Sequence, residues 1–358
     1  MTSYRTLLRP LSVPYEVFAR LRAWSYRKGI VQTRRLPGAV ISVGNLTVGG
    51  TGKTPFVIWL TQNLLDRGKH VAVLTRGYRG QFRGILRGHW ADQAKQSPAI
   101  YASLGDETRI LVSELAKHSN AESNFAIGVG PNRFGRGSEL AQVGFDWFVL
   151  DDGFQHLQLA RDVNILLIDA TNPFGGGYLL PAGNLREPRS ALERADIVVI
   201  TRREHAPAVE TIVRRHSSAP IFYSTIKLRS LTTAVAQQQG DPRVDPPRSA
   251  LFAFSAIGNP TAFFDNMREW GLPVVGHAAF PDHHKFSRAD IEGIEIQART
   301  ASADALVCTK KDAMNLGGVG TGGLPIWVCN VSLEMKDYED FWRAAGEILR
   351  CKRPEFAL

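Results

Sequence analysis

The 358-residue sequence has few cysteines and no long apolar segment, and each absence excludes a class of protein. The three cysteines are widely spaced and form no C-x-x-C pair, so neither a disulfide framework nor a cysteine zinc site is expected. No apolar stretch approaches the roughly 20 residues of a membrane-spanning helix. Charged residues interrupt the N-terminus before any signal-peptide core can form. We therefore expect a cytoplasmic protein of ordinary globular composition.

The charge is unevenly distributed along the chain, and acidic residues are scarce in the N-terminal segment. Residues 1–35 contain eight arginines and lysines against the single acid Glu16, a net charge of +7, whereas the whole chain carries +9. The remainder of the chain is therefore close to neutral. A basic groove for nucleic acid would need clustered charge across the folded domains, so no nucleic-acid partner is expected.

The same basic region predicts an amphipathic helix between residues 14 and 28. Its apolar side chains recur at helical spacing, at Pro14, Val17, Phe18, Leu21 and Trp24. Basic residues combined with Trp and Phe on the apolar side are typical of a helix that lies on an anionic membrane surface. The alternative is a helix that packs on the protein's own core and exposes a basic back to solvent.

The most informative motif is the segment V-G-G-T-G-K-T, which ends at Thr54. It follows the apolar run Ala39–Val43 and precedes the helix-forming run Phe56–Leu65, which is the strand–loop–helix context of a phosphate-binding P-loop. Lys53 is placed to reach the terminal phosphates and the Thr54 hydroxyl to bind Mg²⁺. The position of the motif's first glycine is Thr47. The residues predicted to hold a nucleoside triphosphate are Thr47, Val48, Gly49, Gly50, Thr51, Gly52, Lys53 and Thr54.

Strand-like and helix-like runs alternate along the chain, which predicts an α/β fold of the P-loop NTPase type, with a mostly parallel sheet and helices on both faces. The predicted strands of the first set are Ala39–Val43, His70–Thr75, Phe125–Val129, Trp147–Leu150, Val163–Ile168, Ile197–Ile200 and Ile221–Tyr223, and its predicted helices are Lys53–Leu65, Glu107–Lys117 and Arg136–Gln142. A stretch rich in Gln, Gly, Asp and Pro at residues 237–247 is typical of a linker, and a second alternating set follows it. We predict an amphipathic N-terminal helix in residues 1–35, a P-loop domain in 36–235, and a smaller α/β domain in 236–358 that closes a cleft.

An apolar strand, F-V-L-D-D, ends in the adjacent acids Asp151 and Asp152. With a P-loop in the same sheet, such acids hold Mg²⁺ or its water shell. The alternative is that they only cap a turn.

Three further polar clusters are ambiguous from their pattern alone. Asp106 opens a predicted helix, where an acid also favours the helix dipole. Arg186 and Glu187 lie in a proline-bounded loop that could be purely structural. The pair His283 and His284 follows Asp282 at the end of a strand, but adjacent residues point apart, so a metal site there is not expected.

Seven motifs, in this order, resemble those of the tetraacyldisaccharide 4'-kinase family, the lipid A 4'-kinases of Gram-negative bacteria. They are G-N at 44–45 before the P-loop, R-G-Y at 76–78, G-D-E at 105–107, D-D-G-F-Q-H at 151–156, L-P-A-G with R-E at 180–187, D-H at 282–283 and T-K-K-D-A at 309–313. The resemblance covers nearly the whole chain. It implies ATP-dependent phosphorylation of the 4'-hydroxyl of a tetraacylated glucosamine disaccharide 1-phosphate. It also implies work on the cytoplasmic face of the inner membrane, with peripheral or monotopic attachment through the N-terminal helix.

The resemblance also implies residue roles. Asp106 matches the family's catalytic base, and His283 matches the histidine paired with it across the cleft, although His284 leaves open which histidine serves. Asp151, Asp152 and Glu187, with Thr54, would surround Mg²⁺. The expected contacts to the anionic lipid or the transferred phosphate are Asn45, Arg76, Arg133 and Arg186.

Two other functions remain open from the residues. The segment T-K-K-D ending at Asp312 is similar to the guanine-reading motif of a regulatory GTPase. However, the Asp151–Phe154 segment lacks D-x-x-G spacing, and Thr309 lies too far from Lys53 for a compact GTPase core. The third possibility is a membrane-associated nucleotide sensor without catalysis.

Overall fold

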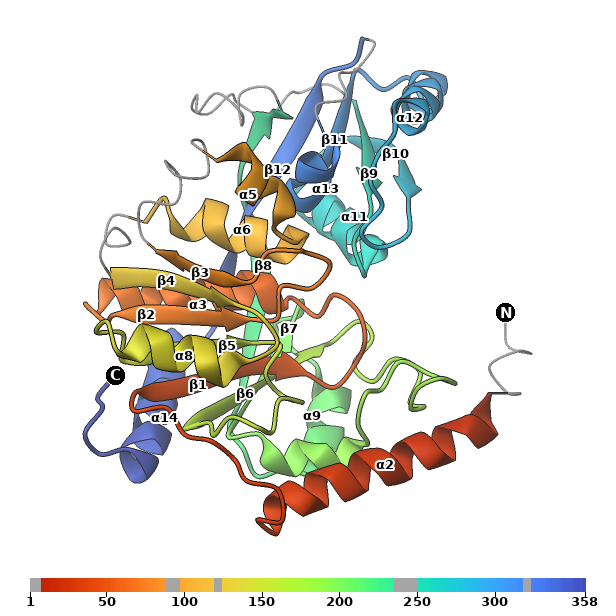
Figure 1. The fold of residues 1–358 in the computed structure, drawn as a ribbon. Coiled ribbons are helices and arrows are strands. Elements are labelled where there is room, and N and C mark those ends of the chain that lie inside the picture. The colour runs from red at the N-terminus through yellow and green to blue at the C-terminus, as the bar shows by residue number, and fades with distance from the viewer. Residues whose placement is uncertain (1–7, 88–96, 119–123, 235–249, 318–322) are drawn as a thin grey trace. The chain divides into compact units, whose positions relative to one another are not determined.

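The structure is a computed structural model that describes residues 8–87, 97–118, 124–234, 250–317 and 323–358 (Figure 1). The linker predicted at residues 237–247 lies outside the described residues. Mostly parallel strands alternate with helices, and this confirms the predicted α/β fold.

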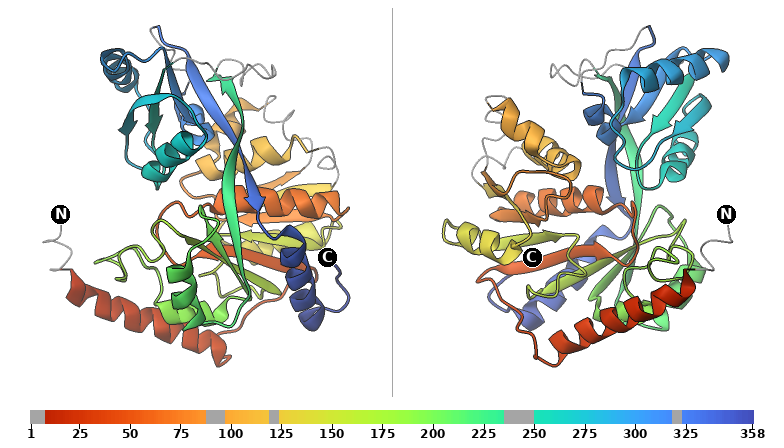
Figure 2. Two further views of the ribbon diagram at one scale, coloured as in Figure 1. Left: turned by 180° about the vertical axis from the view of Figure 1, so that it is seen from behind. Right: turned by 45° about the vertical axis from the view of Figure 1, so that its right-hand side comes forward.

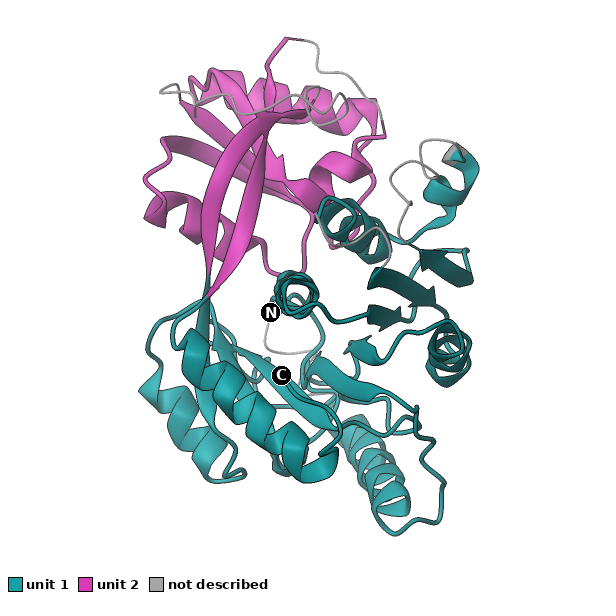
Figure 3. Ribbon diagram, turned by 90° about the vertical axis from the view of Figure 1, so that its left-hand side faces the viewer, with its two compact units in different colours: residues 1–225, 335–358 teal, residues 226–334 magenta. Residues whose placement is uncertain are grey.

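The chain forms two compact units (Figure 3). Unit 1 comprises residues 1–225 and 335–358, and unit 2 comprises residues 226–334. Strands β8 (Ile221–Thr233) and β12 (Ile326–Met335) each run from one unit into the other. The division differs from the predicted boundaries, because residues 335–358 return to unit 1. Helix α14 (Tyr338–Lys352) carries an aromatic face that packs on the helix after the P-loop, with Trp342 stacked on Trp59 at 5.8 Å.

The sheet of unit 1 is parallel except at one edge. Its strand order is β8, β7 (Ile197–Thr201), β6 (Val163–Asp169), β1 (Ala39–Asn45), β5 (Trp147–Asp151), β2 (Val71–Thr75), β4 (Phe125–Val129) and β3 (Gly84–Arg87). Among the described strands of this unit, β3 at the edge pairs antiparallel with β4. Helices cover both faces of the strands from β7 to β4, so these strands are buried and read as continuous apolar runs.

Two helix layers cover the two faces of the sheet of unit 1 (Figure 1). One layer contains α3 (Lys53–Asp66), α6 (Asp106–Leu115) and α14. The other contains α8 (Arg133–Ala141), the 3-10 helix η1 (Arg189–Arg194) and α9 (Pro207–Arg214). The short helix α5 (Pro98–Ser103), β3, η1 and α9 were not predicted, because each is short and lacks a long apolar period.

Helix α2 (Arg9–Arg27) is longer than the predicted helix (Figure 2). None of its residues is buried. Its polar side chains bond the loop segments of unit 1, with Ser12 Oγ 2.9 Å from the carbonyl oxygen of Leu179. Within the described parts of the chain no helix, α2 included, has the length and apolarity that crossing a bilayer requires.

Unit 2 has its own sheet and core. Its strand order is β10 (Val274–Ala279), β9 (Leu251–Ser255), β11 (Ala305–Thr309), β12 and β8, and its helices are α11 (Pro260–Glu269), α12 (Arg288–Thr300) and α13 (Lys310–Asn315). Phe252 and Phe254 of β9 pack in one apolar cluster, whereas Leu251 and Ala253 pack in the other. The alternation buries both faces of this strand.

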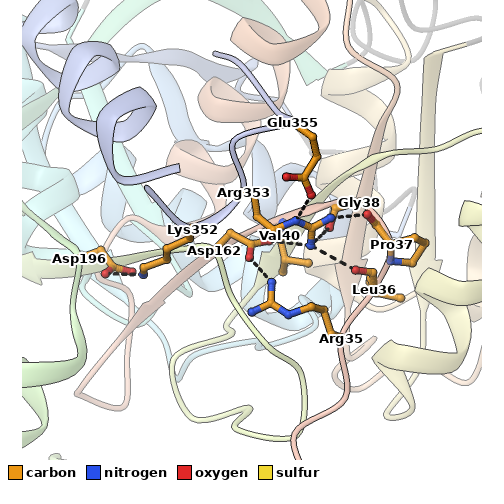
Figure 4. A network of polar contacts seen from close by, with 10 residues as sticks. All are labelled: Arg35, Leu36, Pro37, Gly38, Val40, Asp162, Asp196, Lys352, Arg353 and Glu355. Carbon is orange, nitrogen blue, oxygen red and sulfur yellow. Dashed lines mark hydrogen bonds and ion pairs between the residues drawn. The ribbon is translucent and has the colours of Figure 1, made fainter. Parts of the chain in front are cut away.

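The amino end of β1 is held by the end of the chain, in a network that we call the C-terminal latch (Figure 4). Its residues are Arg35, Asp162, Asp196, Lys352, Arg353 and Glu355. The guanidinium of Arg353 donates to the carbonyl oxygens of Leu36, Pro37 and Gly38 and lies 3.8 Å from Asp162. The Asp162 carboxylate in turn accepts a bond from the amide of Val40 at 2.8 Å.

Candidate active site

The carboxyl ends of the central strands of unit 1 bring the predicted phosphate and metal residues together. Asn45 ends β1, Asp151 ends β5 and Thr75 ends β2. These strands are parallel neighbours, so the three side chains lie at one edge of the sheet. The Thr75 hydroxyl donates to Asp151 Oδ2 at 2.9 Å, which fixes the orientation of this carboxylate.

The P-loop lysine is oriented by Asn45. Gly52 has a φ of 84°, a left-handed conformation that favours glycine, and it turns the chain directly into α3. Lys53 then donates to Asn45 Oδ1 at 3.1 Å and lies 3.6 Å from Asp152 Oδ1. Asn45 also donates to the carbonyl oxygen of Thr47 at 2.8 Å. The buried Asn45, predicted to contact substrate, therefore organises the P-loop itself.

The P-loop backbone is held from its outer side. The amide of Val48 bonds the carbonyl of Asn184 at 2.7 Å, and Thr201 Oγ1 donates to the carbonyl of Thr51 at 3.1 Å. Among the described residues, the buried Thr51 hydroxyl has no hydrogen-bond partner. A buried polar atom without a partner is costly unless a ligand satisfies it. The loop therefore fits a bound phosphate chain.

The adjacent acids have opposite protonation behaviour. Burial and the nearby carboxylates of Glu107 and Asp152 raise the pKa of Asp151 to about 7. Burial also raises the pKa of Asp152, but the charges of Lys53 and Arg186 outweigh it and lower this pKa to about 2. Arg186 Nη1 lies 3.0 Å and 2.8 Å from the two Asp152 oxygens. Acids gathered in this way fit a divalent cation, whose charge would relieve their repulsion.

Glu187, the third predicted metal carboxylate, is engaged elsewhere. Both of its oxygens accept bonds from Arg194, at 2.7 Å and 2.9 Å. In the described part of the chain, no group of three or more His, Cys, Asp or Glu side chains is arranged to hold a metal ion. A magnesium ion would thus need oxygen ligands from phosphate and water besides those of Asp151 and Asp152, which is its usual preference in nucleotide sites.

A cationic cluster lies beside the acids. Arg133 is only 5% exposed, and its Nη1 lies 3.4 Å from the carbonyl of Asp152. Arg76, just beyond β2, is exposed. His156 was not singled out from the sequence, although it closes the D-D-G-F-Q-H motif. Burial and the surrounding arginines, Arg133 foremost, lower the pKa of His156 to about 4. A neutral imidazole among arginines suits an anionic ligand.

Asp106 occupies the first position of α6 and pairs with Arg109, one turn later, at 2.7 Å. The residue before it, Gly105, approaches another backbone closely, since a Cβ there would lie 2.1 Å from the carbonyl oxygen of Tyr78. The R-G-Y and G-D-E motifs therefore pack against each other, and this contact fixes where α6 begins.

The two histidines of unit 2 have different surroundings. His284 is 3.1 Å from Asp290 and stacks on Phe280 with ring centroids 5.1 Å apart. His283 has a φ of 64°, and its Nε2 lies 3.6 Å from Asp282. Local packing thus engages His284 structurally. The pairing of Asp106 with His283 joins two units and stays a prediction.

The segment similar to a guanine-reading motif has a structural role. Thr309 and Asp312 form a capping box at the start of α13. The fully buried Asp312 also accepts bonds from Ser255 at 3.0 Å and from the amide of Ala256 at 2.8 Å. All of these bonds stay within unit 2, so they explain the acid without a guanine base.

The P-loop, the paired acids and the parallel sheet define a P-loop nucleotide-dependent phosphotransferase. The sequence model described as Tetraacyldisaccharide-1-P 4'-kinase matches residues 4–349, and the chain belongs to this family. It is a kinase of lipid A biosynthesis, as the sequence motifs predicted.

Known relatives support this assignment along most of the chain. The chain is 41% identical over 322 residues to a tetraacyldisaccharide 4'-kinase of Geobacter metallireducens, covering 87% of this chain and 89% of that one. A relative from Geobacter sulfurreducens is 37% identical over 356 residues, covering 96% and 94%. The crystal structure of LpxK from Aquifex aeolicus in complex with ATP superimposes with a TM-score of 0.67 at 28% identity, covering 97% and 99%.

Proposed function

We propose that this kinase transfers the γ-phosphoryl group of ATP, with Mg²⁺, to the 4'-hydroxyl of a tetraacylated glucosamine disaccharide 1-phosphate at an anionic membrane surface. The observation that carries the proposal is the arrangement of Lys53, Asn45 and Asp152 at the edge of the sheet. This places one cation and one metal-binding acid beside a phosphate-binding loop.

The residues from Thr47 to Thr54 would hold the triphosphate of ATP, with Lys53 on its terminal phosphates. Thr54, Asp151 and Asp152 would hold Mg²⁺, which when bound supplies positive charge beside the transferred phosphoryl group. Glu187 would act on the metal site indirectly and not as a direct Mg²⁺ ligand, because Arg194 already bonds both of its carboxylate oxygens. Phosphoryl transfer depends mainly on positioning and charge neutralisation, and these residues supply both.

Asp106 would accept the proton of the sugar hydroxyl. The adjacent Arg109 guanidinium lies 2.7 Å from the Asp106 carboxylate and orients it. His283 would pair with Asp106 when the two units close on the substrates. A weak base is sufficient here, since the bond to the attacking oxygen is little formed in a loose transition state and little positive charge develops on that oxygen.

Arg76 and Arg133 would neutralise the phosphate of the acceptor or the transferred group. Arg133 is buried, and its Nε has no hydrogen-bond partner among the described residues. Arg186 would act mainly through Asp152, which it bonds directly. An acceptor with a phosphate at the other end of the disaccharide matches this excess of cations.

Helix α2 would dock on the anionic cytoplasmic face of the inner membrane. Its apolar side chains are largely exposed, with Phe18 at 66% and Trp24 at 46%. Exposed apolar side chains on a helix within a basic region match a surface of acyl chains beneath anionic headgroups. Two roles were predicted for this helix, docking on a membrane surface or packing on the protein's own core. Docking is favoured, because none of the α2 residues is buried.

The decisive experiment incubates the protein with ATP, Mg²⁺ and the disaccharide 1-phosphate, and measures the lipid product by mass spectrometry. One added phosphate, lost on chelation of the metal, is expected. Absence of the phosphorylated product under every detergent condition would refute the proposed acceptor.

A second experiment tests the membrane surface with anionic vesicles. The protein is expected to bind, and high salt should weaken binding without abolishing it, because salt screens charge but not apolar insertion. A variant with Phe18→Ser, Leu21→Ser and Trp24→Ser is expected to stay in solution with unchanged ATP affinity. If the wild-type protein does not bind vesicles and this variant unfolds, the helix is a core element.

A further inference from the structure

We infer that α2 is a positioning element for the phosphate-binding loop. Its side chains Tyr15 and Arg22 hold two loops whose own bonds reach the P-loop, so occupancy of its outer, apolar face is coupled to phosphoryl transfer. The coupling to lipid rests on the membrane docking proposed above. The positioning by Tyr15 and Arg22 does not.

The first route runs through the loop before η1. The Tyr15 hydroxyl donates to the carbonyl oxygen of Arg186 at 3.0 Å. The backbone amide of Arg186 donates to the carbonyl oxygen of Leu46 at 2.7 Å, and Leu46 is the residue before the P-loop. The neighbouring Asn184 carbonyl accepts the amide of Val48 at 2.7 Å. A single α2 hydroxyl is thus two hydrogen bonds away from Leu46, the residue next to the P-loop.

The second route runs through the segment after β5. Arg22 Nη2 donates to the carbonyl oxygen of Gln155 at 2.9 Å. The Gln155 side chain then donates to the carbonyl of Asn45 at 2.9 Å, and Asn45 is the residue that holds Lys53. Both routes therefore start on α2 and meet at adjacent residues, Asn45 and Leu46.

The two routes are also joined to each other at the site. Arg186 Nη1 bonds Asp152 and lies 3.4 Å from Gln155 Oε1. Tyr15 itself packs against an apolar cluster of unit 1 that includes Leu179 and Leu185, whereas Phe18 and Leu21 of the same helix are exposed. One face of α2 is therefore bound to the catalytic loops while the other is open to a partner surface.

The positioning is tested by Tyr15→Phe and Arg22→Met, assayed in detergent at saturating acceptor. Loss of one hydrogen bond predicts a kcat lower by about threefold for Tyr15→Phe, and by about tenfold for the charged donor in Arg22→Met. The KM for acceptor should change little, and the Mg²⁺ requirement should rise because Arg186 and Asp152 shift. Arg22→Lys should restore part of the lost turnover.

Matched variants separate positioning from charge and from simple destabilisation. Arg20→Met removes the same charge from the same helix, but the partner of Arg20 within the described residues is Glu16, one turn away at 2.7 Å. Tyr26→Phe removes the same hydroxyl elsewhere on α2. Both should retain wild-type kcat in detergent. If Tyr15→Phe and Arg22→Met also retain wild-type kcat and Mg²⁺ dependence, the inference is overturned.

The coupling is tested by hydrogen exchange of the full chain, with and without vesicles of phosphatidylglycerol. Amide exchange in residues 45–49 and 184–187 should slow when vesicles bind to the wild type. In Tyr15→Phe and Arg22→Met, vesicles should still bind but the slowing should be lost. Equal slowing in these variants would overturn the coupling. A wild type that does not bind vesicles would refute membrane docking, while the detergent assay still decides the positioning.

Discussion

The two ends of strand β1 differ in how completely their buried polar groups are hydrogen-bonded. At its amino end, the C-terminal latch satisfies the carbonyls of Leu36, Pro37 and Gly38 and the buried carboxylate of Asp162 (Figure 4). At its carboxyl end, the buried Thr51 hydroxyl lacks a partner among the described residues. One strand therefore carries a satisfied structural network at one end and an incompletely satisfied ligand site at the other.

The difference teaches where stability and function reside in this unit. A buried polar network in which every group has a hydrogen-bond partner makes a fold rigid. Buried polar atoms and charges without such partners lower stability and are available to bind a ligand. Asp151, with its pKa raised to about 7 by burial and nearby carboxylates, belongs to the second kind. Substitutions at the two ends should therefore separate loss of turnover from loss of folding.

The largest expected effect is at the carboxyl end. Lys53→Ala should lower phosphate transfer by about 10³-fold or more, because the transferred phosphoryl group loses its neutralising cation. The free energy of unfolding should change by less than about 1 kcal/mol, since only the bonds to Asn45 and Asp152 are lost. Product formation and urea unfolding measure the two quantities. Turnover above a tenth of wild type would contradict the assignment.

A smaller loss of turnover is expected at the proposed base. Asp106→Asn should lower kcat by about 10²–10⁴-fold with ATP affinity nearly unchanged, as for loss of a general base. His283→Ala should act in the same direction, and the double variant should lose less than the product of the two single losses. His284→Ala is the matched control, because this ring binds Asp290 and should affect stability instead. A collapse of ATP binding in Asp106→Asn would move the acid to the metal or the fold.

At the amino end the effect should fall on folding. Arg353→Met should lower the free energy of unfolding by about 2–4 kcal/mol, because Asp162 and three carbonyl groups lose a buried partner. Turnover per folded molecule should stay within about threefold of wild type. Arg343→Met removes an exposed arginine of α14 paired with Asp340, and it should change stability by less than about 1 kcal/mol. Equal unfolding curves for the two variants would show that the latch does not stabilise the unit.

The smallest effect is expected at Thr51, beside the carboxyl end of β1. Thr51→Val replaces a buried hydroxyl by a methyl group of similar size, so the stability of the protein alone should stay equal or rise by up to about 1 kcal/mol. ATP affinity should fall about threefold to tenfold, as for one lost hydrogen bond. Thr61→Val, which removes another buried hydroxyl without a described partner from α3, should leave ATP affinity unchanged. Calorimetric titration with ATP distinguishes the two.

Much of the fold was predictable because the central strands are long apolar runs bounded by turn residues. Strand β4 agrees with its prediction at both ends, and β1 and β5 differ only by residues added at the carboxyl end. Strand β8 was predicted over three residues but continues to Thr233, because its later part is partly exposed and alternates instead of running apolar. The return of α14 to unit 1 depends on aromatic contacts with α3, which no local pattern contains.

The sequence by itself determined the phosphate-binding loop, the acids at a strand end and the basic amphipathic helix, because each depends on residues close together in the chain. Only the tertiary structure decided that Asn45 orients Lys53, that Arg186 binds Asp152, and that Arg194 engages Glu187. It alone showed that Tyr15 and Arg22 reach the loops beside the P-loop. Parallel strands bring distant segments to one edge of a sheet, and which side chains meet there depends on strand order and register rather than on spacing in the sequence.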